Sequence, residues 1–311
     1  MTKKFVPYNY YIIEKLVILM NSVLLNGKKV GDGEPCYFIA EIGVSFKDFS
    51  EGKRLIDSAK KMGVDAVKFQ TYEANTLTTK KNKFDLEITG KVSQYDFHKK
   101  YELSKELQKE IVDYAKKCGI TIFSAPSHMN DIEIIEEMEL PIYKIGSDLA
   151  CHIPLLEKIA RIGKPIILST GMCTVDEIHN SVKAIKNQGN EQIVLMHCVA
   201  DYPSKLEEAN LNAIISMKKE FGIPVGYSDH TLGTITTLAG AIIGANIIER
   251  HFMDPKNMQS PDDPHSLQKE DFGNLIKSIK KIEIAKGSGL KVPSKSEQKN
   301  LLNNRVSIIA M

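Results

Sequence analysis

The chain has 311 residues, of which 42% are hydrophobic and 26% charged, as in a globular protein with one large α/β domain or two smaller ones. Its 41 basic and 39 acidic residues are mixed along the sequence and give a formal net charge of +2, which argues against nucleic-acid binding. The five cysteines are widely spaced and contain no C-x-x-C pair, as expected of reduced thiols in a cytoplasmic protein.

The segment from Tyr8 to Leu25 is strongly apolar, but Glu14 and Lys15 interrupt it. Its uninterrupted runs are shorter than the roughly 18 residues that a membrane span needs. No small-residue cleavage site follows, so neither a membrane helix nor a signal peptide is predicted. We expect a helix or strand packed on the outside of the domain, within an N-terminal extension over residues 1–34. A segment that docks on a membrane or a partner protein is the alternative.

Apolar segments typical of buried strands alternate with amphipathic segments typical of helices from residue 37 onward. The predicted strands are Tyr37–Ile42, Ala66–Gln70, Thr121–Ser124, Ile142–Ile145, Pro165–Ser169, Gln192–His197, Pro224–Ser228 and Ile247–His251. The predicted helices are Phe49–Met62, Ser104–Lys117, Asp131–Glu137, Pro154–Ile162, Thr174–Lys186, Glu207–Phe221, Thr231–Ile243 and Lys269–Ala285.

These repeated strand–helix units, in about 250 residues, predict a (β/α)₈ TIM barrel over residues 35–290. A doubly wound open sheet is the alternative. Two irregular segments, 71–103 and 253–268, follow the second and the eighth strand. Both therefore lie at the C-terminal face of the barrel, which carries the active site in TIM-barrel enzymes. Residues 291–311 are expected to form a linker.

Two predicted strands end in a polar cluster that contains a histidine. Ser228-Asp229-His230 follows the apolar run 223–227, and Glu249-Arg250-His251 follows the run 245–248. A right-handed crossover through the helix between them places the two clusters at the ends of neighbouring parallel strands. A histidine in each cluster predicts a metal site with His230 and His251 as ligands. The alternative is that each histidine only caps its strand by hydrogen bonding.

Polar residues also end the other predicted strands: Glu41, Lys68, Gln70, Ser124, Lys144, Ser147, Ser169, Thr170 and His197. Lysines and hydroxyls that converge on a barrel mouth predict an anion site, because ammonium groups neutralise a phosphate or carboxylate and hydroxyls donate directional hydrogen bonds. Lys68 and Lys144 could instead pair with buried carboxylates. A desolvated lysine could also form a Schiff base, as in class I aldolases.

Three further residues are candidates for the same mouth. Glu41 could take a proton or orient water there, or it could only neutralise Lys68 on the next strand. Asp262, in the loop after the eighth strand, could bind substrate hydroxyls or cap the next helix. Tyr202 could donate to a polar ligand or pack on the rim. The remaining histidines are expected to be surface or loop residues: His128, His152, His179 and His265.

Several ordered segments resemble the motifs of the sialic acid synthase family. They are 38–43 (FIAEIG), 67–71 (VKFQT), 143–147 (YKIGS), 168–172 (LSTGM), 197–198 (HC) with 202–203 (YP), 226–231 (GYSDHT) and 248–252 (IERHF). The similarity spans roughly residues 30–285 and is specific because both the order and the spacing of the motifs match.

The resemblance implies a barrel enzyme that condenses phosphoenolpyruvate with an N-acylated amino sugar such as N-acetylmannosamine. The products would be phosphate and a nine-carbon 2-keto sugar acid. A divalent metal, commonly Mn²⁺ or Mg²⁺, would polarise the sugar aldehyde for attack by C3 of the enol. Water would then add at C2, and the resulting intermediate would lose phosphate with help from the lysines and hydroxyls.

The resemblance also implies a role for each matched residue. It assigns the metal to His230 and His251, and phosphoenolpyruvate to Lys68, Ser147, Ser169 and Ser228. Glu41, Gln70, Tyr202 and Asp262 would face the acceptor sugar. The candidate catalytic residues are thus Glu41, Lys68 and Asp262. The candidate substrate-binding residues are Gln70, Lys144, Ser147, Ser169, Thr170, Tyr202, Ser228 and Asp229.

The chain departs from the family pattern at both the sugar end and the C-terminus. Residues 44–48 (VSFKD) replace an Asn-His-Asn-Gly-like turn, and Ala125, Leu149 and Ala200 replace polar contacts, which should alter acceptor recognition. Residues 305–311 resemble the opening of the antifreeze-like (SAF) domain, which in the family completes the partner subunit's active site. The alternatives are that the chain is truncated, that a separate chain supplies the lid, or that the barrel works without it. The candidate partners are accordingly a second copy of the chain, in a homodimer, or a separate lid-supplying chain. A non-catalytic sugar- or partner-binding barrel is the alternative to an enzyme.

Overall fold

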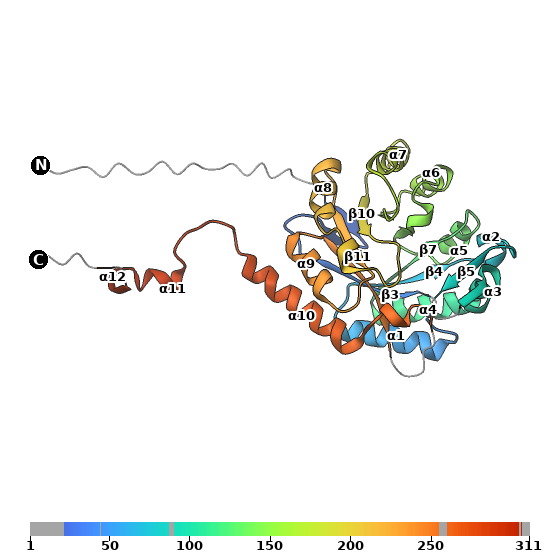
Figure 1. Cartoon of the computed structure of the whole chain (residues 1–311), viewed down its shortest axis with the longest axis horizontal. Helices are drawn as coiled ribbons and strands as arrows, with labels where there is room; N and C mark the ends of the chain where they lie inside the picture. Colours follow the sequence, from blue (N-terminus) through green and yellow to red (C-terminus); the bar gives the residue numbers. More distant parts are fainter. Residues whose placement is uncertain (1–21, 44, 87–89, 255–259, 305, 307–311) are drawn as a thin grey trace, which may run out of the picture.

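The computed structural model describes residues 22–43, 45–86, 90–254, 260–304 and 306. Parallel strands form a closed barrel with helices around it (Figure 1). The barrel strands are β3 (Tyr37–Gly43), β4 (Ala66–Thr71), β7 (Thr121–Pro126), β8 (Tyr143–Ile145), β9 (Ile166–Ser169), β10 (Ile193–Cys198), β11 (Val225–Asp229) and β12 (Ile247–Met253). Each pairs with the next, and β12 pairs with both β11 and β3. This closure confirms the predicted TIM barrel and excludes the open sheet.

The outer helices lie where the sequence predicted them. They are α1 (Phe49–Met62), α4 (Lys105–Cys118), α5 (Asp131–Glu137), α6 (Ile153–Ala160), α7 (Val175–Lys186), α8 (Asn212–Phe221), α9 (Ile235–Ile243) and α10 (Lys269–Lys286). The largest difference is at α8, which begins five residues later than the predicted start at Glu207. Asn210 has a φ of 39°, and this left-handed residue separates a 3₁₀ helix, η2 (Leu206–Glu208), from α8.

Local sequence signals explain how α1 begins, ends and packs. The Asp48 side chain accepts a hydrogen bond from the backbone N–H of Glu51, and Gly63 ends the helix with a φ of 80°. Gly52 lies against α4: a Cβ there would be 2.4 Å from Cδ1 of Ile111. A side chain at residue 52 would therefore force Ile111 to move, and the glycine lets the two helices pack closely.

A hairpin that the sequence analysis did not predict closes the N-terminal end of the barrel. It consists of β1 (Val23–Leu25) and β2 (Lys28–Val30). Its three buried side chains pack in one cluster with apolar residues from the barrel strands: Val23, Leu25, Val30, Tyr37, Ile39, Ala66, Phe123, Ile142, Ile167, Val194, Met196 and Ile247. The hairpin lies within the predicted N-terminal extension, of which residues 1–21 are outside the described part of the chain.

The two irregular segments after β4 and β12 contain short elements. The first holds α2 (Ala74–Leu77), β5 (Lys83–Leu86), β6 (Gly90–Ser93) and α3 (Gln94–Tyr101), and the second holds η3 (Asp263–His265) and β13 (Leu267–Gln268). A further 3₁₀ helix, η1 (Ser147–Leu149), follows β8. Helices α11 (Lys295–Gln298) and α12 (Leu301–Asn304) lie beyond the end of α10 in Figure 1. The segment predicted to resemble an SAF domain is, apart from Val306, outside the described residues.

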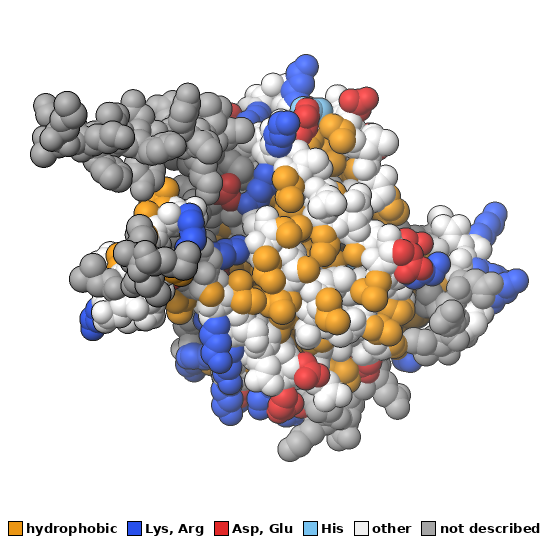
Figure 2. Space-filling model, turned by 60° about the vertical axis from the view of Figure 1, so that its left-hand side comes forward, with side chains coloured by type: hydrophobic (Ala, Val, Ile, Leu, Met, Phe, Trp, Pro, Cys, Tyr) orange, Lys and Arg blue, Asp and Glu red, His pale blue; other side chains and the backbone are white. Residues whose placement is uncertain are grey.

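The surface is mixed in character. Figure 2 shows hydrophobic side chains over the centre of one face, with lysine, arginine, aspartate and glutamate interspersed toward its edges. The exposed hydrophobic residues of α8 and α9 are Ile215, Ile235 and Ile242. Within the described residues, no helix has both the length and the apolar character required to cross a membrane.

Candidate active site

The side chains inside the barrel change from apolar to polar toward the carboxyl ends of the strands. Alternate residues of a strand face the same side, and in four strands an inward apolar residue is followed two positions later by an inward charged one. These pairs are Ile39 and Glu41, Ala66 and Lys68, Ile142 and Lys144, and Ile247 and Glu249. The register places Glu41 beside Lys68 and Ser228 beside Glu249. A polar layer therefore covers the apolar core at the barrel mouth.

Two lysines and two glutamates form a buried cluster in this layer. Lys68 Nζ lies 2.6 Å from Glu41 Oε2 and 3.2 Å from Glu249 Oε1. Lys144 Nζ lies 3.3 Å from the same oxygen of Glu249. Buried charges are tolerated when they are paired, and here the two signs balance. The predicted neutralisation of Lys68 by Glu41 is therefore present, and Glu249, which was not among the predicted site residues, lies between the two lysines.

Burial favours the neutral forms of the lysines and glutamates in this cluster, whereas their ion pairs favour the charged forms. Burial lowers the pKa of Lys68 to about 8, against the attraction of Glu249. Burial alone would raise the pKa of Glu249, but Lys144 and Lys68 hold it at about 2. Near neutral pH both groups are charged, and Lys68 loses its charge as pH rises through about 8. An incoming anion would find the Lys68 ammonium already charged and held in place by Glu41 and Glu249.

The predicted hydroxyl groups lie at different distances from the cluster. Ser228 Oγ is 3.2 Å from Glu249 Oε1, and Ser169 is buried on β9. Ser147, in η1, accepts a hydrogen bond from the backbone N–H of Gly171 at 3.0 Å. Thr170 donates its hydroxyl to the Met196 carbonyl oxygen at 3.0 Å. Ser228 thus contacts the lysine cluster, whereas the Thr170 hydroxyl is engaged by the backbone.

The second half of the mouth contains His230 and His251. His230 Nδ1 lies 2.6 Å from the Val199 carbonyl oxygen, which can only accept, so Nδ1 carries the hydrogen and Nε2 keeps its lone pair. The ring centroids of His230 and His251 are 5.6 Å apart. Burial and the neighbouring His251 lower the pKa of His230 to about 3. His230 is therefore neutral at pH 7, as a metal ligand must be.

Asp262 and Tyr202 also lie at this half of the mouth. Asp262 Oδ2 is 3.3 Å from His251 Nδ1. Burial alone would raise the pKa of Asp262, but His251, His265 and Lys68 hold it at about 2. The ring of Tyr202 lies 4.2 Å from that of His230 and 5.9 Å from that of His251, centroid to centroid, at the exposed rim. Gln70 is half-buried on β4.

The expectation that His265 is a surface or loop residue is wrong, because its side chain is buried in this half of the mouth. It is 3% exposed, and its ring centroid lies 4.6 Å from that of His251. The segment that carries it turns inward because β13 pairs with the end of β12 and Arg250 Nη2 donates to the His265 carbonyl oxygen at 3.2 Å. No periodicity in segment 253–268 indicated this fold.

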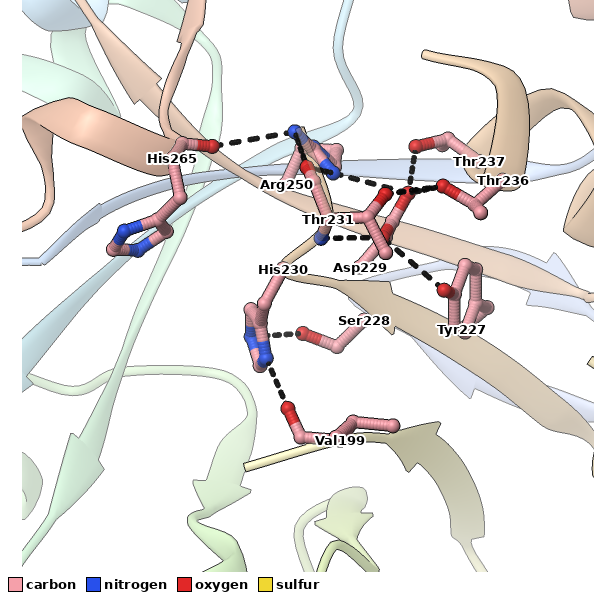
Figure 3. A network of polar contacts seen from close by, with 10 residues as sticks. All are labelled: Val199, Tyr227, Ser228, Asp229, His230, Thr231, Thr236, Thr237, Arg250 and His265. Carbon is pink, nitrogen blue, oxygen red and sulfur yellow. Dashed lines mark hydrogen bonds and ion pairs between the residues drawn. The ribbon is translucent and has the colours of Figure 1, made fainter. Parts of the chain in front are cut away.

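The structure also contradicts the prediction that Asp229 contacts substrate. Its carboxylate lies 3.0 Å from Arg250 Nη1 and accepts hydrogen bonds from the backbone of Thr231 and from the hydroxyls of Tyr227, Thr236 and Thr237 (Figure 3). Because Ser228 faces the barrel interior, the next residue of the strand faces outward, toward α9. Asp229 therefore stabilises the fold beside the site.

The histidine half fits a divalent metal. His251 Nδ1 and His265 Nε2 are buried and lack a hydrogen-bond partner among the described residues. Ligand atoms of His251, Asp262 and His265 all lie within 4.8 Å of one another. Imidazole nitrogens together with a carboxylate oxygen suit Mn²⁺, Fe²⁺, Co²⁺ and Zn²⁺.

Comparison with known proteins identifies the family. Residues 55–291 match the NeuB family. The chain belongs to this family. A protein of Methanocaldococcus jannaschii is 41% identical over 292 residues, which cover 94% of this chain and 84% of that protein. N,N'-diacetyllegionaminic acid synthase of Campylobacter jejuni is 40% identical over 279 residues, covering 88% and 84% of the two chains.

A solved structure of a NeuB relative agrees. The N-acetylneuraminic acid (sialic acid) synthetase of Leptospira borgpetersenii, in complex with citrate, is 29% identical and superposes with a TM-score of 0.81 over 91% of this chain and 96% of that chain. These findings confirm the resemblance to sialic acid synthases predicted from the sequence motifs.

Proposed function

We propose that this NeuB-family barrel is a divalent-metal-dependent synthase that condenses phosphoenolpyruvate with an N-acylated amino sugar. The products are phosphate and a nine-carbon 2-keto sugar acid, of the kind named for its relatives. The observation that carries the proposal is the contact between the two halves of the mouth at Ser228. Its Oγ lies 3.2 Å from Glu249 of the lysine cluster and 3.3 Å from His230 Nε2 of the histidine half. An anion site and a metal site are thus adjacent.

The lysine half is suited to phosphoenolpyruvate. Lys68 and Lys144 can exchange part of their contact with Glu249 for the phosphate and carboxylate of the substrate, since charge-assisted hydrogen bonds to these groups are strong. Ser147, Ser169 and Ser228 can donate to the remaining oxygens. Because these groups are already placed, binding requires little reorganisation.

The histidine half would hold the metal through His230 and His251, with Asp262 beside them. When bound, the metal supplies Lewis acidity at the aldehyde oxygen of the sugar. The Val199 carbonyl oxygen keeps the His230 ring in one orientation by accepting from Nδ1. Tyr202 covers the histidines at the rim and restricts the access of water to them.

Glu41 and the lysines would act on the bonds that change. The enol phosphate forms a bond from C3 to the sugar aldehyde carbon, which leaves a positive charge at C2 and turns the aldehyde oxygen into an alkoxide. Glu41 takes a proton from the water that adds to C2, and a proton from solvent converts the alkoxide into a hydroxyl. The C2–oxygen bond to phosphate then breaks as the C2 hydroxyl gives up its proton and becomes the keto group, and Lys68, 2.6 Å from Glu41, stabilises the negative charge on the departing phosphate.

A phosphate-release assay tests this function. The protein is incubated with phosphoenolpyruvate, Mn²⁺ and a panel of mono- and di-N-acylated amino sugars, and phosphate and the 2-keto acid are both quantified. We expect equimolar products with at least one sugar and no phosphate release without a sugar. No turnover with any sugar, together with no metal binding, would contradict the enzymatic function and favour a binding role for the barrel.

A further inference from the structure

His265 is a buried histidine with a ring nitrogen that no hydrogen bond satisfies in the part of the chain that the structure describes. Its exposed fraction is 3%, and its Nε2 has no hydrogen-bond partner among the described residues. Buried polar groups in proteins are nearly always satisfied, so an unpaired one needs an explanation. Asp262 Oδ1 lies 4.0 Å from this nitrogen, which is too long for a hydrogen bond.

The three histidine rings are close enough to share one ion. Their centroids are 4.6 Å apart for His251 and His265, 5.6 Å for His230 and His251, and 6.3 Å for His230 and His265. Because a metal–nitrogen bond is about 2.1 Å, two imidazoles on one ion can have centroids up to about 6.5 Å apart. All three separations lie within this limit.

Asp262 adds a carboxylate to the three histidines. Atoms of Asp262, His251 and His265 that can ligate a metal lie within 4.8 Å of one another. Asp262 reaches this position over Gly43, where a Cβ would be 2.7 Å from Asp262 Oδ2. Any larger residue at position 43 would displace the carboxylate, so the backbone of β3 leaves room for it.

One buried guanidinium holds the three histidine-bearing segments together (Figure 3). Arg250 precedes His251 and donates to the carbonyl oxygen of Thr231, which follows His230, at 2.9 and 3.0 Å. It also donates to the carbonyl oxygen of His265 itself at 3.2 Å. A single side chain thus links the backbone at or next to His230, His251 and His265, as expected for a preorganised ligand set.

From these contacts we propose that His265 is a third imidazole ligand of the divalent metal, with His230, His251 and Asp262 as the other protein ligands. The inference rests on the proposed metal-dependent function and adds a ligand to the pair predicted from sequence. It also changes the expected metal. Three imidazoles favour Mn²⁺, Co²⁺ or Zn²⁺ over Mg²⁺, which prefers oxygen ligands and bound water.

The number of ligating histidines in the wild-type protein is the decisive measurement. We would load the full chain with Mn²⁺, label its histidines with ¹⁵N, and count the coupled nitrogens by pulsed EPR without added substrate. Three histidines are expected in the wild type and two in His265→Ala. Two in the wild type would overturn the inference and leave the proposed function standing. No Mn²⁺ binding at all would overturn both.

Affinity measurements with a matched control support the count. We expect His265→Ala and His265→Gln to weaken Mn²⁺ binding about 10- to 100-fold, with a smaller change for Mg²⁺. His179→Ala is the control, because His179 is exposed and pairs with Glu220 away from the mouth, and it should bind Mn²⁺ as the wild type does. Unchanged Mn²⁺ affinity in both His265 variants would contradict the inference. If a variant fails to fold in EDTA, the wild-type count still decides.

Discussion

The two ends of the barrel interior are built from the same strands but differ in chemistry. At the N-terminal end, the β1–β2 hairpin packs three buried apolar side chains against inward apolar residues of the barrel, which include Ile39, Ala66, Ile142 and Ile247. Two residues further along β3, β4, β8 and β12, the inward positions carry Glu41, Lys68, Lys144 and Glu249. The same strands thus carry apolar residues that stabilise the fold at one end and the candidate site at the other.

The energetic roles of the two ends differ for a physical reason. Burying one leucine or isoleucine side chain contributes about 1.5–3 kcal/mol to stability. A buried ion-pair cluster contributes little or costs stability, because desolvation offsets the attraction between the charges. The apolar end can therefore offset the cost of burying charges at the mouth. Substitutions at the two ends should separate cleanly into effects on unfolding and effects on activity.

The largest effect on activity is expected from His251→Ala at the mouth. Loss of this ligand should reduce metal-dependent turnover about 1000-fold or more, equivalent to about 4 kcal/mol of transition-state stabilisation. The midpoint of thermal unfolding in EDTA should stay near that of the wild type, because the side chain faces the mouth. Phosphate release and metal content measured together test this. Metal-dependent activity that survived the substitution would refute the ligand assignment.

The network behind the mouth should affect stability instead. Asp229→Asn leaves the buried Arg250 without its ion pair and should lower the free energy of unfolding by about 3–5 kcal/mol. The KM for phosphoenolpyruvate should not change in the folded fraction. Denaturant unfolding and steady-state kinetics measure the two quantities. An increased KM with unchanged stability would restore Asp229 as a substrate contact.

Substitutions in the hairpin at the N-terminal end of the barrel should change stability but not activity. Leu25→Ala removes a fully buried side chain from the hairpin and should cost about 2–4 kcal/mol. The adjacent Leu24 is 52% exposed, so Leu24→Ala is a matched control that should change stability by less than about 0.5 kcal/mol. Both variants should keep the wild-type kcat. Equal stabilities of the two variants would show that the hairpin does not close the barrel.

The smallest expected effect is a pH dependence from Lys68. Because burial lowers its pKa to about 8, Lys68 is charged below that pH and neutral above it. Binding of anionic phosphoenolpyruvate should therefore weaken as pH rises through 8, and its KM should increase severalfold by pH 9.

Lys68→Met provides the comparison for this profile. It should raise the KM throughout and remove the rise above pH 8, since no charge is left to lose. A substrate adduct trapped by borohydride in the wild type and absent from Lys68→Met would instead indicate a Schiff base at this lysine.

The sequence predicted the barrel because each strand and helix carries its own periodic signal. The hairpin at the N-terminal end also had a signal, Asn26-Gly27 between apolar residues, with φ values of 47° and 82° as in a two-residue turn. Period-2 alternation, applied strictly, would also have corrected two assignments. Residues two apart on a strand face the same side, so Glu249 faces the mouth as His251 does. Adjacent residues face opposite sides, so Asp229 faces away from the mouth, toward which Ser228 points.

His265 had no comparable signal. It lies in an irregular segment, and its position depends on a backbone carbonyl held by Arg250 and on the pairing of β13 with β12. Such contacts join residues whose order in the chain carries no period. A sequence pattern can place a residue after a strand, but it cannot decide whether the following loop turns inward or outward.

The sequence by itself determined the strand–helix order, the polar strand ends and the family, because these depend on local periodicity and on the order of motifs. Tertiary structure decided which side chains meet: Lys68 with Glu41 and Glu249, and His265 with His251 and Asp262. The physical reason is that barrel closure and loop packing set distances between residues far apart in the chain, and ionisation and metal binding depend on those distances.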